Sequence, residues 1–238
     1  MVILMSDLYQ VFDETECVIL SCRDVIECYD FSRVGDVYLF ALIEPSTQHV
    51  DFLLNNHTYT LKHPGFEGRL YFDFSVKKII KSNGVIYLNL SIANGMYKVG
   101  VFSLLKSCKG NNGRIWLDMV QKSKEIYISA SYIIGGVRRR LEKNPIIIEG
   151  KYIHDYYSFY CELGYAFFGD FGYMGNNLDA FADCIVEVKR KNGPIDVIWK
   201  DSSISFKAID NTLPSEVYPL SSYDMIDILR EHCNLILE

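Results

Sequence analysis

The segment FGYMGNNLDAFADCI, from Phe171 to Ile185, is the most informative stretch of this 238-residue chain. Asp179 and Asp183 are four residues apart on a predicted helix, and that spacing places both carboxylates on one helical face. Asn176 or Asn177 can cap the helix, and glycines alternate with aromatic residues just before it. We therefore predict a tight aromatic loop followed by an acidic helix face, which together form a surface for a basic partner.

The charge is distributed unevenly along the chain. Residues 1–145 contain 17 Lys and Arg against 15 Asp and Glu, whereas residues 146–238 contain 7 against 15. The net charge of −6 therefore comes from the C-terminal part. An acidic balance argues against direct binding of nucleic acid and favours a basic protein partner.

The cysteines and the apolar segments indicate a cytoplasmic protein without a membrane partner. The seven cysteines are scattered without a CxxC pair, and Cys161, Cys184 and Cys233 lie in apolar patterns, as buried reduced thiols do. The apolar start MVILM is short, with no basic residues before it and no cleavage-like site. No apolar run approaches the length of a membrane-spanning helix.

Residues 1–145 are predicted to form a mainly antiparallel β domain of unknown function, either a sandwich or a partly open barrel. Short helices could begin near Asp24 or cover Ile115–Ser123. Turn signals include Ser82-Asn83-Gly84, Asn94-Gly95 and Gly110–Gly113. The predicted strands are rich in β-branched and aromatic residues: Glu16–Cys22, Asp36–Ile43, Arg69–Phe74, Val85–Ile92, Tyr97–Leu105 and Glu125–Ile133.

No motif in residues 1–145 predicts chemistry. His49, His57 and His63 surround a predicted hairpin, but no carboxylate or cysteine pattern joins them, so we expect surface histidines, no metal site and no cofactor. The charged run RRRLEKNP reads as a linker that ends at Pro145. We place the domain boundary there.

Residues 146–238 alternate predicted strands with predicted helices. Strands are expected at Ile146–Glu149, Ile195–Trp199 and Asn234–Leu237, and helices at Asp155–Phe168, Asn177–Val188, Ser203–Ile209 and Tyr223–Glu231. Short strands that alternate with helices predict a small three-stranded parallel sheet packed by helices.

This element order and the segment YMGNNLDAFADCI resemble the barstar family of intracellular inhibitors of the bacterial ribonuclease barnase. Identities with the family pattern G-x-N-L-D-A-L-x-D-C-L are Gly175, Asn177, Leu178, Asp179, Ala180, Asp183 and Cys184. The first strand with its glycine (IIIEG), the strand IDVIWKD and the C-terminal LREHCNLILE support the resemblance. It covers residues 146–238 and none of residues 1–145.

The resemblance implies an immunity or antitoxin protein, not an enzyme, that blocks the active site of a small basic ribonuclease toxin. Asp183 then matches the principal aspartate that occupies the place of a substrate phosphate, Asp179 the second acidic contact and Tyr173 the aromatic loop contact. Glu231 matches the glutamate of the last helix when the apolar stripe is aligned, and Asp227 matches it when Cys233 is aligned. The full set of expected partner-binding residues is Asp183, Asp179, Tyr173, Gly175, Asn177, Ala180, Phe171 and Glu231.

Two departures from the family concern aromatic contacts. Ala182 and Val188 stand where the family has tryptophans, so the partner surface is expected to differ from that of barnase itself. Phe168 or Phe171, in a loop about two residues longer, could replace a lost contact.

Two other functions fit the same residues less well. An enzyme could use Asp179 and Asp183 as paired carboxylates, but one helical turn places them on a convex face without a His, a Cys or a third carboxylate. Alternatively, the chain is a two-domain adaptor, whose barstar-like domain binds a non-ribonuclease protein and whose β domain binds a second partner.

Overall fold

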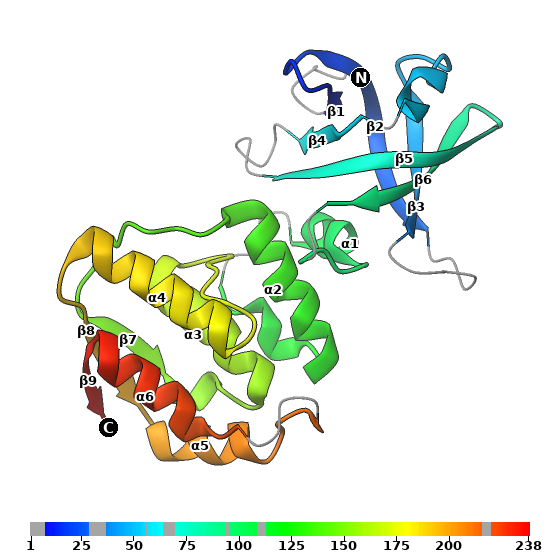
Figure 1. The fold of residues 1–238 in the computed structure, drawn as a ribbon. Helices are drawn as coiled ribbons and strands as arrows, with labels where there is room; N and C mark the ends of the chain where they lie inside the picture. Colours follow the sequence, from blue (N-terminus) through cyan, green and yellow to red (C-terminus); the bar gives the residue numbers. More distant parts are fainter. Residues whose placement is uncertain are drawn as a thin grey trace. The chain divides into compact units, whose positions relative to one another are not determined.

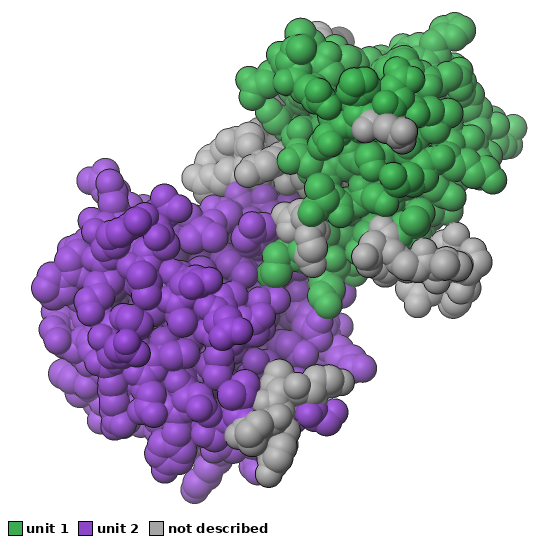
Figure 2. All heavy atoms as spheres, in the orientation of Figure 1, with its two compact units in different colours: residues 1–107 green, residues 108–238 purple. Residues whose placement is uncertain are grey.

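The computed structural model describes residues 8–28, 37–55, 57–63, 70–93, 96–108, 113–215 and 220–238. The chain divides into two compact units, Met1–Ser107 and Cys108–Glu238 (Figure 2). This division does not coincide with the boundary predicted near Pro145. The reason is that helix α2 (Gln121–Gly135) packs against helix α3 (Tyr156–Phe168) and therefore groups with the second unit.

The first unit is a closed antiparallel barrel of six strands, which confirms the predicted antiparallel sheet domain. Around the barrel the strands follow the order β1 (Tyr9–Phe12), β2 (Val18–Cys28), β3 (Val37–Pro45), β6 (Val85–Ile92), β5 (Leu70–Ser82) and β4 (Tyr59–His63) (Figure 1). Inward-facing Leu20, Val25, Phe40, Phe74 and Leu88 are buried in its core. Closure pairs every strand on both sides and leaves no free edge.

The hairpin between β5 and β6 is the turn that the sequence predicted most directly. Ser82 pairs with Val85, and Asn83 and Gly84 between them have φ angles of 49° and 78°. Two consecutive residues with positive φ match the twist of the flanking strands, and Asn-Gly adopts that conformation at low cost. The predicted turn at Asn94-Gly95, most of the one at Gly110–Gly113, and the strand ends Asp36 and Arg69 lie outside the described residues.

Four local predictions in residues 1–145 are wrong, and three of them concern short segments. Tyr97–Leu105 is not a strand, because helix α1 (Val101–Ser107) begins within it and buries Val101, Phe102 and Leu105. No helix begins near Asp24, since β2 continues through Cys28 in register with β3. Residues 115–123 are not one helix: a 3-10 turn, Ile115–Asp118, precedes α2.

The largest error is the strand predicted at Glu125–Ile133, which lies inside helix α2. Apolar residues alternate there as in a strand, but the buried residues of α2 include a row with helical spacing, formed by Lys124, Tyr127, Ile128 and Ser131. Two of these four residues, Lys124 and Ser131, are polar, so the helical spacing of the buried positions cannot be recognised as an apolar pattern in the sequence. Lys124 is buried because its ammonium group binds the Asp155 carboxylate at the start of α3.

The second unit contains the predicted three-stranded parallel sheet, in the order β7 (Ile146–Glu149), β8 (Asp196–Lys200) and β9 (Asn234–Leu237). The helices packed around it are α3, α4 (Leu178–Asn192), α5 (Ser202–Asp210) and α6 (Ser222–His232), and α2 packs against α3 (Figure 1). Ile148, Phe159, Phe181, Ile185 and Trp199 are fully buried in the core. Each predicted element of this part is therefore confirmed, within a few residues at its ends.

Candidate functional site

Helix α4 carries the acidic face, and its local sequence sets where it starts and ends. Asn177 is the N-cap, and its side-chain oxygen accepts a hydrogen bond of 2.8 Å from the Ala180 N–H. Gly193, with φ of +80°, ends the helix after the basic residues Lys189, Arg190 and Lys191. Asp179 therefore lies in the first turn, where the helix dipole stabilises negative charge.

Asp179 and Asp183 are both exposed on the face of α4 opposite Phe181, Ile185 and Val188, which are fully buried. Neither carboxylate has a hydrogen bond or ion pair with any residue that the structure describes. Glu187, one turn further along, differs because it binds Arg139 at 3.0 Å and Arg190 at 2.7 Å. Two adjacent turns of α4 thus present negative charges that remain available to a partner.

The loop before α4 is held close to the helix by glycine. Gly175 has φ of +96°, and a Cβ there would lie 2.5 Å from the backbone nitrogen of Phe181. Upstream, a Cβ on Gly172 would lie 2.0 Å from the carbonyl oxygen of Gly164 on α3. Any side chain at these two positions would force backbones apart, so the loop 169–175 needs Gly172 and Gly175 to reach the start of α4.

The loop aromatics are mainly packing residues. Tyr173 is 4% exposed, and its ring packs edge-on against Tyr132 of α2 with centroids 4.9 Å apart. Burial raises the pKa of Tyr173 above its ordinary value. Phe171 is half-buried and stacks on Tyr127 of α2 with centroids 5.1 Å apart. A direct partner contact through Tyr173 stays a prediction, restricted to the small exposed part of its side chain.

The two positions that depart from the family differ in their surroundings. Val188 is 0% exposed, so this residue belongs to the core and not to a binding surface. Ala182 is partly exposed next to Asp183, as is Ala180 next to Asp179. Only Ala182 can therefore change a partner contact directly.

Glu231 is exposed on α6, which packs beside α4 (Figure 1). The Lys189 ammonium group lies 3.4 Å from the Glu231 carbonyl oxygen, which places Glu231 near the C-terminal end of α4. Lys189 follows Asp183 by six residues, or about 9 Å along the helix. Both helices lead into neighbouring parallel strands, so they run in the same direction, and Asp227 lies about one turn nearer to the acidic pair than Glu231.

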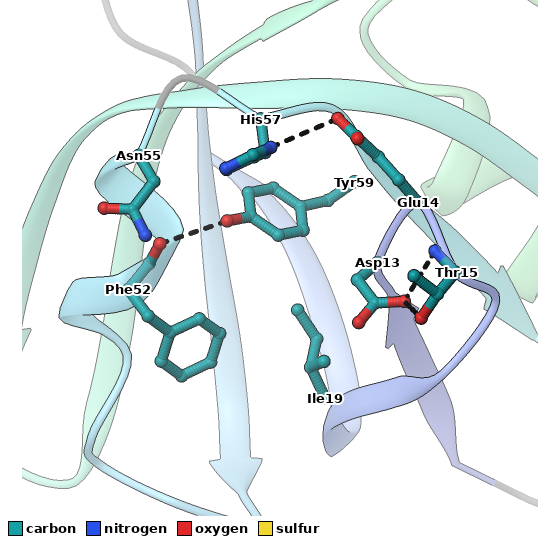
Figure 3. A pocket seen from close by; sticks show the side chains of 8 residues that line it. All are labelled: Asp13, Glu14, Thr15, Ile19, Phe52, Asn55, His57 and Tyr59. Carbon is teal, nitrogen blue, oxygen red and sulfur yellow. Dashed lines mark hydrogen bonds and ion pairs between the residues drawn. The ribbon is translucent and has the colours of Figure 1, made fainter.

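A separate pocket of about 270 Å³ lies in the barrel unit, between the turn after β1 and the 3-10 turn Asp51–Leu54 (Figure 3). Several of its polar groups bind one another or the backbone. The His57 Nδ1 lies 3.3 Å from the Glu14 carboxylate, the Tyr59 hydroxyl donates to the Phe52 carbonyl at 3.0 Å, and Asp13 accepts from Thr15. These contacts satisfy Asp13, Glu14, His57 and Tyr59 within the protein.

The described residues contain no group of three or more His, Cys, Asp or Glu side chains that could hold a metal ion. Near the predicted hairpin, His49 is exposed, His57 binds Glu14, and the side chain of His63 lies outside the described residues. In the part of the chain that the structure describes, no helix is both long enough and apolar enough to cross a membrane.

The sequence did not identify Tyr127 and Tyr132 as part of the site. Tyr127 stacks on Phe171, and Tyr132 packs against Tyr173. Their segment was predicted to be a strand of the other domain. A helical reading that allowed a buried lysine at position 124 would have found them.

Comparison with known proteins identifies one segment of the chain. Neither the curated proteins nor the solved structures yielded a match. A family model does match, and its residues include β7, α3, the glycine-rich loop, α4, β8 and α5, but neither α2 nor α6. Residues 144–215 match the Barstar (barnase inhibitor) family, and the fold of the second unit is consistent with that α/β domain.

Proposed function

We propose that this protein is an immunity or antitoxin protein that binds and blocks the active site of a barnase-like bacterial ribonuclease. The observation that carries the proposal is the pair of exposed carboxylates, Asp179 and Asp183, on the first two turns of α4, which have no hydrogen bond or ion pair among the described residues. This helix lies inside the segment that matches the barnase inhibitor family. The ribonuclease is expected in the same cytoplasm or in a rival cell.

The physical basis of inhibition is substitution of a carboxylate for a phosphate. A ribonuclease cleft holds phosphates with cationic side chains, and a carboxylate that enters it forms short charge-assisted hydrogen bonds with the same groups. In this proposal Asp183 takes the phosphate position and Asp179 supports it.

The rigidity of α4 favours tight binding. The helix is capped by Asn177 and anchored in the core through Phe181 and Ile185, so the carboxylates are already ordered before a partner arrives. A preordered group loses less conformational entropy on binding than a flexible one.

Electrostatic attraction is expected to increase the rate of association with the ribonuclease. Residues 146–238 contain 15 acidic against 7 basic side chains, and an acidic surface accelerates encounter with a basic protein. Because exposed charges are screened by salt, the association rate is expected to fall as ionic strength rises.

The test measures inhibition of RNA cleavage by barnase with the full chain and its variants. Asp183→Ala should weaken inhibition by roughly 2–5 kcal/mol, because it removes a desolvated charge, and Asp179→Ala should weaken it less. Glu142→Gln, which removes an exposed charge outside α4, serves as the control for net charge. Unchanged inhibition by Asp183→Ala, with an active wild-type chain, would show that the assigned interface is wrong.

The same assay tests which acidic residue of α6, Glu231 or Asp227, contacts the ribonuclease. Alignment of the apolar stripe favoured Glu231, whereas the parallel packing of α4 and α6 supports Asp227 as the residue nearer to the acidic pair. We expect a larger loss of inhibition for Asp227→Ala than for Glu231→Ala, and the reverse order would restore Glu231.

A further inference from the structure

The segment that precedes the family match, residues 113–143, holds the loop 169–175 from outside. The Gly113 N–H donates to the Asp170 carboxylate at 2.8 Å, and the Arg138 guanidinium donates to the Phe168 carbonyl at 3.0 Å. Between these two contacts, the Phe171 N–H donates to the Tyr127 hydroxyl at 3.2 Å. Three hydrogen bonds from one segment therefore restrain the backbone of residues 168–171 and the Asp170 side chain.

Tyr127 contacts Phe171 in two ways. Its hydroxyl accepts the hydrogen bond from the Phe171 backbone, and its ring stacks on the Phe171 ring at an interplanar angle of 24°. Phe171 has φ of 50°, a conformation that is uncommon for a residue with a side chain and that needs support from its surroundings. Tyr127 is 1% exposed and supplies that support.

Tyr132 covers the next loop aromatic. Its half-buried ring packs edge-on against Tyr173 at an interplanar angle of 74°. Two residues further along, the backbone at Gly175 approaches Phe181 of α4 so closely that no side chain would fit. The restraint therefore passes from α2, through Phe171 and Tyr173, to the first turn of the acidic helix.

Helix α2 is itself fixed to the α/β fold. Lys124 binds Asp155, the N-cap of α3, and both side chains are buried. Before α2, the Arg114 guanidinium binds the fully buried Glu162 carboxylate through two contacts of 2.6 and 2.9 Å. Buried charges need their partners, so α2 cannot leave α3 without a large loss of stability.

We propose that Tyr127 and Tyr132 of α2 are positioning residues for partner binding, which set the loop 169–175 so that α4 presents Asp179 and Asp183. This proposal rests on the proposed inhibitory function and extends it to a segment outside the match at residues 144–215. The inhibitory surface thus depends on residues 113–143 as well as on the family segment.

The test uses Tyr127→Phe in the full chain, because this change keeps the stacked ring and removes the hydroxyl that binds Phe171. Hydrogen exchange of the Phe171 amide should accelerate about two- to tenfold, the equivalent of one net hydrogen bond, and inhibition of barnase should weaken within the same range. Tyr132→Ala should weaken inhibition as well, because it uncovers Tyr173.

The matched control is Tyr156→Phe at the N-terminal end of α3, whereas the loop 169–175 follows the C-terminal end. This change removes the buried hydroxyl contact of 3.0 Å with Tyr160. It should cost similar stability and leave both readouts unchanged. Unchanged Phe171 exchange and unchanged inhibition in Tyr127→Phe, or equal effects of Tyr156→Phe, would overturn the proposal. If the wild-type chain fails to inhibit barnase, the proposed function loses its support for that enzyme, while the exchange comparison still decides whether Tyr127 positions the loop.

Discussion

Replacement of Arg114 tests whether the segment before the family match is part of the fold of the second unit. The Arg114 guanidinium donates to both oxygens of Glu162, whose side chain is 0% exposed, and lies between the rings of Tyr152 and Tyr165 at 4.2 and 4.3 Å. Glu162 also accepts a hydrogen bond of 3.1 Å from the Glu149 N–H of β7. Arg114→Ala leaves this buried carboxylate without its cation.

The expected loss is about 3–5 kcal/mol of unfolding free energy at pH 7, the usual cost of removing one partner from a buried ion pair. The two cation–π contacts are included in that range, since Arg114 is partly exposed and each contact adds only about 0.5–1 kcal/mol. The loss is a large fraction of the roughly 5–15 kcal/mol that stabilises a typical domain.

The loss should depend on pH in a defined direction. Burial already raises the pKa of Glu162 above its ordinary value of 4.5, and Arg114 opposes that rise. Without Arg114 the folded-state pKa rises further, so the folded variant binds a proton more tightly than the unfolded chain does. The loss of unfolding free energy in Arg114→Ala should therefore be smallest near pH 4.5 and should grow as the pH rises through the folded-state pKa of Glu162.

Urea unfolding followed by tryptophan fluorescence measures this effect in the second unit alone, because the only two tryptophans, Trp116 and Trp199, both belong to it. Arg190→Ala is the control, since its guanidinium is 69% exposed against Glu187 and its loss should be below about 1 kcal/mol. A loss below about 1 kcal/mol for Arg114→Ala, without pH dependence, would refute the reasoning.

Two further predictions concern the loop and the thiols. Gly175→Ala should destabilise the second unit by about 1–3 kcal/mol or more in the same urea assay, because a positive φ and a contact of 2.5 Å to the Phe181 nitrogen both oppose a side chain. Gly169→Ala, also at positive φ but with open space around its Cβ, should cost less, and equal losses would contradict the steric argument. Burial raises the pKa of Cys184 and of Cys233 to about 11, so at pH 8 a thiol reagent should modify exposed Cys17 before either of them. The contribution of these two buried thiols to the unfolding free energy should be fully present below their ordinary pKa of 9 and should be lost as the pH rises towards 11. Urea unfolding midpoints measured across that pH range check this prediction.

Local signals account for what could be predicted in the second unit. The Asn177 cap, the stop at Gly193 and the apolar stripe of α4 are decided within a few residues of sequence, so the helix and its acidic face were predictable. The same holds for the hairpin at Asn83-Gly84 in the barrel. Barrel closure was not predictable, because it depends on the pairing of β1 with β4, which lie far apart in the sequence.

The amino-acid sequence alone determined the order of strands and helices in residues 146–238 and the position of Asp179 and Asp183 on one face of α4. The tertiary structure decided which side chains on and around α4 are buried and which are exposed. It buried Tyr173 beneath Tyr132, placed Val188 in the core, and left the two carboxylates exposed without described partners. It also converted residues 125–133 from an expected strand into part of α2, because burial of Lys124 becomes favourable only when Asp155 supplies the opposite charge from a distant part of the chain.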